Sequence, residues 1–136
     1  MARITGDKEH EKRLQKLYGL QAQAEIAQGL FVAGSEIETE AQQSITEGSI
    51  SGKGHVPSAP GEPPNADTRL LDTSIDTVVI SKNPATVHVI SNAPYSAALE
   101  FGTSKMEERP FMRPAAQKKR KRVLEIIAAV VRVVTR

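Results

Sequence analysis

Carboxylates and imidazoles are the side chains most able to do chemistry in this chain. Asp67, Asp72 and Asp76 lie near one another in the sequence, as a carboxylate pair for general acid–base catalysis would. Asp67 is, however, well placed to cap a short helical turn, and Asp72 falls in a turn. The histidines are His10, His55 and His88. None of them has a second ligand three or four residues away, as a converging metal site requires. We therefore expect no catalytic residue, no metal and no cofactor.

Motifs for phosphate binding and nucleophilic catalysis are also incomplete. The run Gly52-Lys53-Gly54 lacks the longer Gly-x-x-x-x-Gly-Lys-Ser/Thr pattern that cradles phosphates after a strand. No Gly-x-Ser-x-Gly elbow occurs among the serines. The chain has no cysteine, which excludes disulfides, thiolate metal sites and thiol nucleophiles. The sequence predicts a protein that is not an enzyme and has no small-molecule substrate.

Five adjacent cations form the strongest charge feature. They are Lys118, Lys119, Arg120, Lys121 and Arg122. Residues 117–136 carry a balance of +6 in a chain of net charge +2. One interpretation is contact with nucleic-acid phosphates or with an acidic partner, and the other is a solvated helix surface. No aromatic residues interleave with the run, so sequence-specific readout by base stacking is not expected.

Residues 93–115 combine large apolar side chains with residues that restrict the backbone. Tyr95 and Phe101 supply aromatic groups in a chain that is only 4% aromatic. Gly102 can adopt a positive φ, so we expect it to end the turn that contains Glu100. These features indicate a surface that is packed or docked against another.

Two prolines punctuate the end of the same segment. Pro110 and Pro114 fix φ and remove hydrogen-bond donors. We therefore expect Phe111 and Met112 to lie in an extended stretch before a helix whose first residue is Pro114. Plain core packing is the simplest role for Phe101, Phe111 and Met112.

The hydrophobic pattern predicts an α+β fold in a single domain, residues 1–136. Apolar residues recur at a spacing of about four along residues 7–47, which is one face of a long helix. We expect a kink or break near Gly19, because glycine weakens a helix. Small residues farther along would let a second helix approach closely. These are Gly29, Ala33 and Gly34.

The rest of the chain comprises a loop rich in glycine and proline, a predicted hairpin and a second predicted helix. Residues 48–66 are dense in glycine and proline, which predicts a mobile linker or flap. Asp67 or Thr68 could cap the short turn that follows. Residues 74–81 and 86–91 then predict a β-hairpin, and both helices should lie on one face of this small sheet. The expected organisation is an N-terminal helical region (1–47), the loop (48–66), the hairpin and signature segment (67–113) and a C-terminal helix packed on the sheet (114–136).

Several short motifs resemble those of a bacteriophage family. They are Ala93-Pro94-Tyr95, Glu100-Phe101-Gly102-Thr103 and Arg109-Pro110-Phe111-Met112-Arg113-Pro114-Ala115. The upstream motifs are Ser58-Ala59-Pro60-Gly61-Glu62-Pro63-Pro64 and Leu70-x-x-x-Ser74-Ile75. Together they are similar to the small tail-completion, or neck, proteins of long-tailed bacteriophages, the HK-ninety-seven gene-product-ten-like family. The sequence departs from the family pattern at Arg69, where that pattern has a glycine after threonine.

The resemblance implies a structural virion protein without a cofactor. Such proteins form rings, here a hexamer or dodecamer, between the head connector and the tail tube. The implied partners are the connector, tail terminator and tail tube proteins, with packaged DNA nearby. The loop at residues 48–66 is the candidate contact with other subunits or the tail tube. The protein would be made in the bacterial host cytoplasm. The residues expected to carry the contacts are Tyr95, Glu100, Phe101, Gly102, Arg109, Phe111, Met112 and Arg113. Of these, Arg109 and Arg113 are expected to bond backbone carbonyls or carboxylates.

An alternative to the structural role is a non-specific nucleic-acid-binding module that uses the cations at 118–122. Its affinity would fall steeply with salt, whereas ring assembly through apolar and β contacts would not. No run of 18 apolar residues occurs, so the sequence predicts no membrane-spanning segment.

Overall fold

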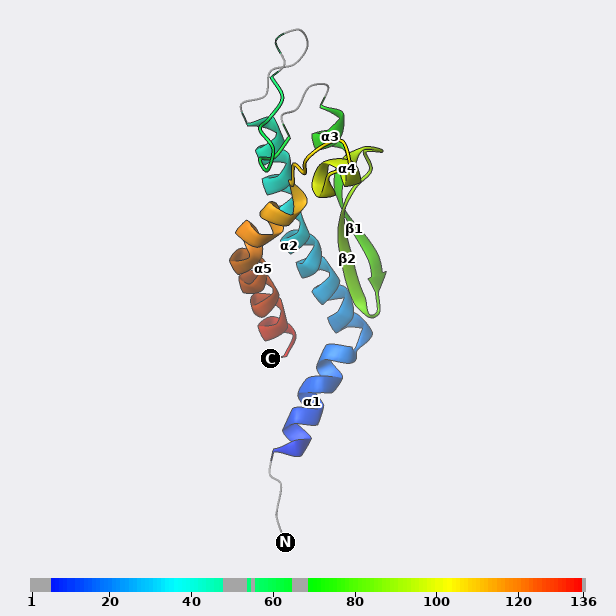
Figure 1. Cartoon of the computed structure of the whole chain (residues 1–136). Helices are drawn as coiled ribbons and strands as arrows, with labels where there is room; N and C mark the ends of the chain where they lie inside the picture. The colour runs from blue at the N-terminus through cyan, green and yellow to red at the C-terminus, as the bar shows by residue number, and fades with distance from the viewer. Residues whose placement is uncertain (1–5, 48–53, 55, 65–68, 136) are drawn as a thin grey trace.

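The computed structural model describes residues 6–47, 54, 56–64 and 69–135 (Figure 1). Asp67, Thr68, His55 and residues 48–53 of the long loop lie outside these ranges, so what was expected of them stays a prediction. The elements in chain order are α1 (Asp7–Tyr18), α2 (Leu20–Thr46), α3 (Leu70–Thr73), β1 (Ile75–Lys82), β2 (Ala85–Ser91), α4 (Ser96–Phe101) and α5 (Met112–Val134). This is the α+β fold that the sequence predicts.

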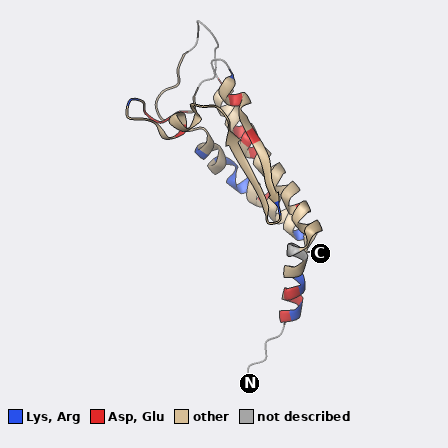
Figure 2. Cartoon of the chain, turned by 90° about the vertical axis from the view of Figure 1, so that its right-hand side faces the viewer, with Lys and Arg blue, Asp and Glu red and all other residues tan. Residues whose placement is uncertain are grey.

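Gly19 divides the N-terminal helical region. Its backbone is extended, with φ −63° and ψ 147°, so the helix that ends at Tyr18 cannot continue through it. This confirms the predicted break. Beyond the break, α2 runs through the middle of the molecule, whereas α1 extends away from the body past the end of the hairpin (Figures 1 and 2).

The hairpin, α2 and α5 form three layers with α2 in the middle (Figure 1). A Cβ on Gly29 would collide with Val130 of α5, and a Cβ on Gly34 would lie 2.7 Å from Cγ2 of Thr77 in β1. The expectation of a closely packed second helix is therefore right at Gly29 and wrong at Gly34, where the neighbour is a strand. Five residues correspond to about 140° around a helix, so the two glycines face different layers. Both long helices lie on one side of the sheet, and most of α5 packs on α2.

β1 and β2 pair as the predicted antiparallel hairpin, each strand differing from its predicted bounds by about one residue. The register is regular up to Val79 and shifts before Ser81, so Ile80 has no Cα partner. Ile80 is 55% exposed. Within the described residues the sheet has two strands, which leaves the outer edge of each strand without a strand partner.

The core lies where the C-terminal end of α2 meets α3, the first residue of β1 and the first turn of α5. Its buried residues are Ala41, Ile45, Leu71, Ile75, Ala93, Phe111 and Ala115. α5 begins at Met112, two residues before the predicted start at Pro114, and the preceding Phe111 has a ψ of −32°, so the expectation that Phe111 and Met112 are extended is wrong. The first four N–H groups of a helix have no partner within it, so a proline at the third position removes no helix hydrogen bond.

Candidate interaction surface around Glu100 and Arg113

Glu100 lies in the last turn of α4 and holds the first turn of α5. It is 5% exposed, and Gly102 ends α4 with a φ of 75°. Its Oε2 accepts the backbone N–H groups of Phe111 at 2.8 Å and Met112 at 3.0 Å, and its Oε1 accepts that of Arg113 at 2.9 Å. These groups have no acceptor in their own helix, and the helix dipole favours an anion there. Glu100 therefore caps α5 from a different element.

Arg113 ties the same carboxylate to the loop after α4. Its Nε donates to Oε1 of Glu100 at 3.0 Å, and its Nη2 donates to the Glu100 carbonyl at 2.7 Å and to Oε2 of Glu108 at 2.8 Å. The expectation that Arg113 bonds carboxylates and carbonyls is confirmed. Burial raises the pKa of Glu100, but the three backbone N–H groups and Arg113 outweigh it, so this pKa lies below its ordinary value of 4.5. Glu100 is an anion at neutral pH.

Two aromatic side chains lie in solvent beside this network. Phe101 is 69% exposed and Tyr95 is 41% exposed. The guanidinium of Arg113 lies over the Phe101 ring, 5.2 Å from its centroid, which is within the range of a cation–π contact. The expectation that Phe101 packs in the core is wrong, because Glu100 takes the inward position and the next helical residue points about 100° away. Phe111, by contrast, is 1% exposed and lies in the core.

The chain turns sharply at Gly102. A Cβ there would lie 2.9 Å from the backbone N of Glu108 and 3.0 Å from the carbonyl O of Met106. Gly102 thus supplies both a positive φ and a close backbone approach. The N–H of Arg109 donates to a carbonyl of α4 at 2.6 Å. Its side-chain Nε is buried and has no hydrogen-bond partner within the described residues, so the bond expected of this side chain is not found there.

Part of the Gly/Pro-rich loop packs on this region. Residues 56–64 contain no helix or strand, as their composition predicts. They are attached to the body, however, because the Gly61 N–H donates to the Glu108 carbonyl at 2.9 Å and both Ser58 and Pro64 are buried. This differs from the free linker or flap that the composition predicts. A backbone hydrogen bond and two buried side chains hold this stretch in place.

Three of the five cations in the basic run pair with acids of α2. Lys118 Nζ lies 2.6 Å from Oε1 of Glu40, and Lys119 Nζ lies 3.6 Å from Oε2 of Glu36. Arg122 Nε lies 4.0 Å from Oε1 of Glu36. The cations without an ion pair in the described part of the chain are Arg120 and Lys121. These two acids were not predicted as partners, although they lie four residues apart and so share one helix face, which was a usable signal.

The remaining candidate groups do not converge. Asp72 is 3% exposed and its Oδ2 accepts from Nη2 of Arg69 at 3.0 Å. Asp76 is exposed and its Oδ2 accepts from Asn92 at 3.2 Å. Asp67 lies outside the described residues. Among the residues whose positions are described, no cluster of three or more His, Asp or Glu side chains could hold a metal. None of the described helices is long and apolar enough to span a membrane.

The comparisons with known proteins agree with the resemblance seen in the sequence. The family model described as "Bacteriophage HK97-gp10, putative tail-component" matches residues 8–102. The match includes the hairpin and α4 with Glu100, Phe101 and Gly102, while the partner residues on α5 lie beyond it. No curated protein and no solved structure matches the chain. Because the family model covers well over half of its length, the chain belongs to the HK97-gp10-like family of bacteriophage tail components.

Proposed function

We propose that this tail component is a neck protein that joins the tail tube to the head connector by assembling into a ring. Its family places it among the structural proteins of the phage tail, and hence in the virion. The proposed neighbours are copies of itself in a hexamer or dodecamer, and the connector, tail terminator and tail tube proteins. The described residues include exposed aromatic side chains beside Glu100 and no converging chemical groups, which supports a structural role.

The observation that carries this proposal is an exposed aromatic side chain beside the buried carboxylate of Glu100 and the half-exposed Arg113. Phe101 is 69% exposed although it adjoins the buried Glu100. Arg113, which lies over its ring, is fixed by hydrogen bonds to Glu100 and Glu108. Aromatic and arginine side chains carry much of the binding energy at protein interfaces, and a side chain fixed beforehand loses less entropy on binding. Phe101 and Arg113 together are therefore suited to docking another protein.

The hairpin supports assembly with further copies. Its two outer edges carry backbone N–H and C=O groups that no strand of the described chain pairs. Val79 is 38% and Ile80 is 55% exposed, so apolar surface accompanies one of these edges. A two-stranded sheet gains stability from additional strands. If each copy contacts the next through a different surface, the assembly closes into a ring when the rotation from copy to copy completes a full turn.

The rival nucleic-acid function receives less support. Glu36 and Glu40 pair with three cations of the basic run. Arg120 and Lys121 remain for phosphate contacts. Two such contacts would give weak DNA binding whose affinity changes little with salt concentration. A protein that makes many phosphate contacts binds DNA strongly at low salt and loses orders of magnitude in affinity between about 50 and 200 mM salt. Such behaviour would favour the rival function.

Complementation of a phage that lacks this gene tests the proposal. Phe101→Ala removes exposed surface, so we expect the free energy of unfolding to change by less than about 0.5 kcal/mol. Loss of an interface anchor costs about 2 kcal/mol or more, which is roughly 30-fold in affinity. We therefore expect infectious titre to fall by at least about tenfold, with unjoined heads and tails in electron micrographs.

The matched control is Leu124→Ala, a substitution of another exposed apolar residue. Leu124 is 56% exposed on α5 and has no part in the surface around Phe101. Its variant should restore wild-type titre. Normal titre with Phe101→Ala, or wild-type particles whose necks lack this protein, would refute the proposed function.

A further inference from the structure

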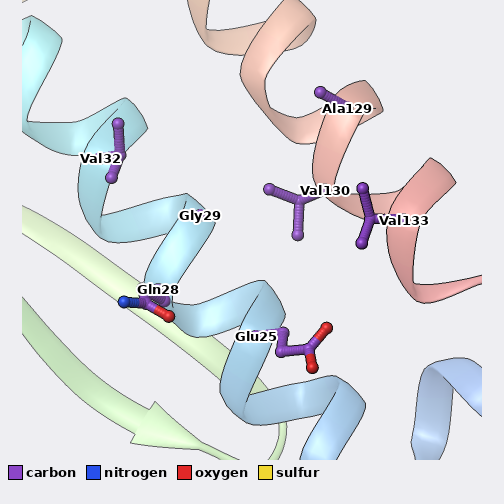
Figure 3. A pocket seen from close by; sticks show the side chains of 7 residues that line it. All are labelled: Glu25, Gln28, Gly29, Val32, Ala129, Val130 and Val133. Carbon is purple, nitrogen blue, oxygen red and sulfur yellow. The ribbon is translucent and has the colours of Figure 1, made fainter.

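An apolar groove runs between α2 and α5 (Figure 3). Its volume is about 430 Å³, which is large enough to admit several side chains. Gly29 forms its floor, and Val32 and Val133, which are 50% and 57% exposed, form its walls. Among the residues with described positions, Glu25 is the one charged residue that lines it. The groove therefore offers an apolar face to solvent with a single acid at its border.

The helix next to this groove has little support of its own. α1 has 12 residues and stands away from the body in both views (Figures 1 and 2). Isolated helices of about 12–15 residues are marginal in water, so α1 needs a surface to pack against. Leu14 is 39% exposed and Leu20, just after the break, is 75% exposed. A helix with few contacts to α2 and α5 and an open apolar groove thus occur in the same chain.

We propose that the groove of one copy holds α1 of a second copy. A helix of 12 residues is about 18 Å long, and the groove measures about 10 Å along α2 from Glu25 to Val32. The helix α1 is therefore long enough to cover the whole groove. Leu14 would enter the groove, and the adjacent Arg13 would lie near Glu25, the acid at the border of the groove. This inference rests on the ring assembly proposed above and names one of its contacts.

The direction of α1 favours a second copy over the same chain. The extended backbone of Gly19 sends α1 away from the body of the molecule (Figure 1). To reach its own groove, α1 would have to reverse direction at this residue. When it reaches a neighbour instead, each copy gives a helix to the next and receives one. Contacts of this head-to-tail kind form a closed ring when the rotation from copy to copy completes a full turn.

Engineered cysteines test the contact directly, because the chain has none of its own. Full-length Leu14→Cys and Val32→Cys proteins are mixed and oxidised. A complex holds the two thiols at an effective concentration on the order of millimolar, against micromolar in free solution. We expect the mixed disulfide to form at least about tenfold faster than in a control mixture of Leu14→Cys with Leu124→Cys. Leu124 is nine residues from Val133 and so lies about half a turn around α5 from the groove.

Self-association of intact variants gives a second measurement. Light scattering coupled to size exclusion should show the wild type associating as its concentration rises. Val32→Glu places a charge in the groove and should weaken association at least about tenfold. Leu124→Glu, which changes an equally exposed residue outside the groove, should associate like the wild type. Circular dichroism verifies that both variants keep their helices.

Three outcomes would overturn the inference. They are equal cross-linking in the test and control mixtures, association of Val32→Glu at wild-type strength, and an intramolecular disulfide in the Leu14→Cys, Val32→Cys double variant. The last would show that α1 folds onto its own chain. Any of these results, together with a titre defect for Phe101→Ala, would leave the proposed neck role standing while removing this contact.

Discussion

Replacing Glu100 with glutamine tests whether this one buried carboxylate determines where α5 begins. Glutamine keeps the shape but offers one oxygen where the carboxylate has two. If the glutamine NH₂ group takes the place of Oε2, the backbone N–H groups of Phe111 and Met112 lose their acceptor. If it takes the place of Oε1, the backbone N–H and the Nε–H of Arg113 lose theirs. Each buried donor left unsatisfied costs about 1–3 kcal/mol. We therefore expect the free energy of unfolding to fall by about 2–5 kcal/mol.

The size of this effect should depend on pH. The pKa of Glu100 in the folded protein lies below the value of 4.5 taken for the unfolded chain. The folded state therefore binds fewer protons at this site, and the carboxylate stabilises the fold above pH 4.5. That contribution disappears as the pH falls through the folded-state pKa. Glutamine does not titrate, so the stability difference should be largest near neutral pH and shrink in acid.

Urea unfolding followed by circular dichroism, from neutral pH to about pH 3, measures both effects. Amide hydrogen exchange at Phe111 and Met112 should also accelerate in Glu100→Gln, since these groups lose their acceptor in one orientation of the amide. The control is Glu108→Gln, whose side chain is 52% exposed and which should lose less than about 1 kcal/mol. The reasoning is refuted if Glu100→Gln is as stable as the wild type, or if its deficit is the same at every pH.

Two glycine substitutions test the close packing elsewhere. Gly102→Ala forces a side chain into a φ of 75° and within 3.0 Å of the Met106 carbonyl, so thermal unfolding should show a loss of at least about 2 kcal/mol. An unchanged melting temperature would contradict that close approach. Gly29→Ala gains about 1 kcal/mol of helix propensity but pushes against Val130, so urea unfolding should show a net loss of about 1–2 kcal/mol. A stabilised variant would mean that α5 can shift away at no cost.

The features predicted correctly from the sequence depend on a few neighbouring residues. The break at Gly19 follows from the low helix propensity of glycine, and the end of α4 at Gly102 follows from a positive φ that glycine adopts without penalty. The hairpin follows from two β-rich runs on either side of a short turn. Gly29 also marked a close helix contact correctly. Near Pro114, the prediction from neighbouring residues placed the start of α5 two residues too late. The acceptor for the first N–H groups is Glu100, which lies in another element.

The sequence by itself therefore determined the kinds of elements, their order and the family. The tertiary structure alone decided that Glu100 faces inward to cap α5 while Phe101 faces solvent, and that Glu36 and Glu40 neutralise much of the basic run. Local conformation is governed by residues within a turn or two, which a sequence displays directly. The partners of a carboxylate or a cation are governed by which elements meet in space. Lys118 and Glu40 are far apart in the chain, and only the packing of α5 on α2 brings their charges within 2.6 Å.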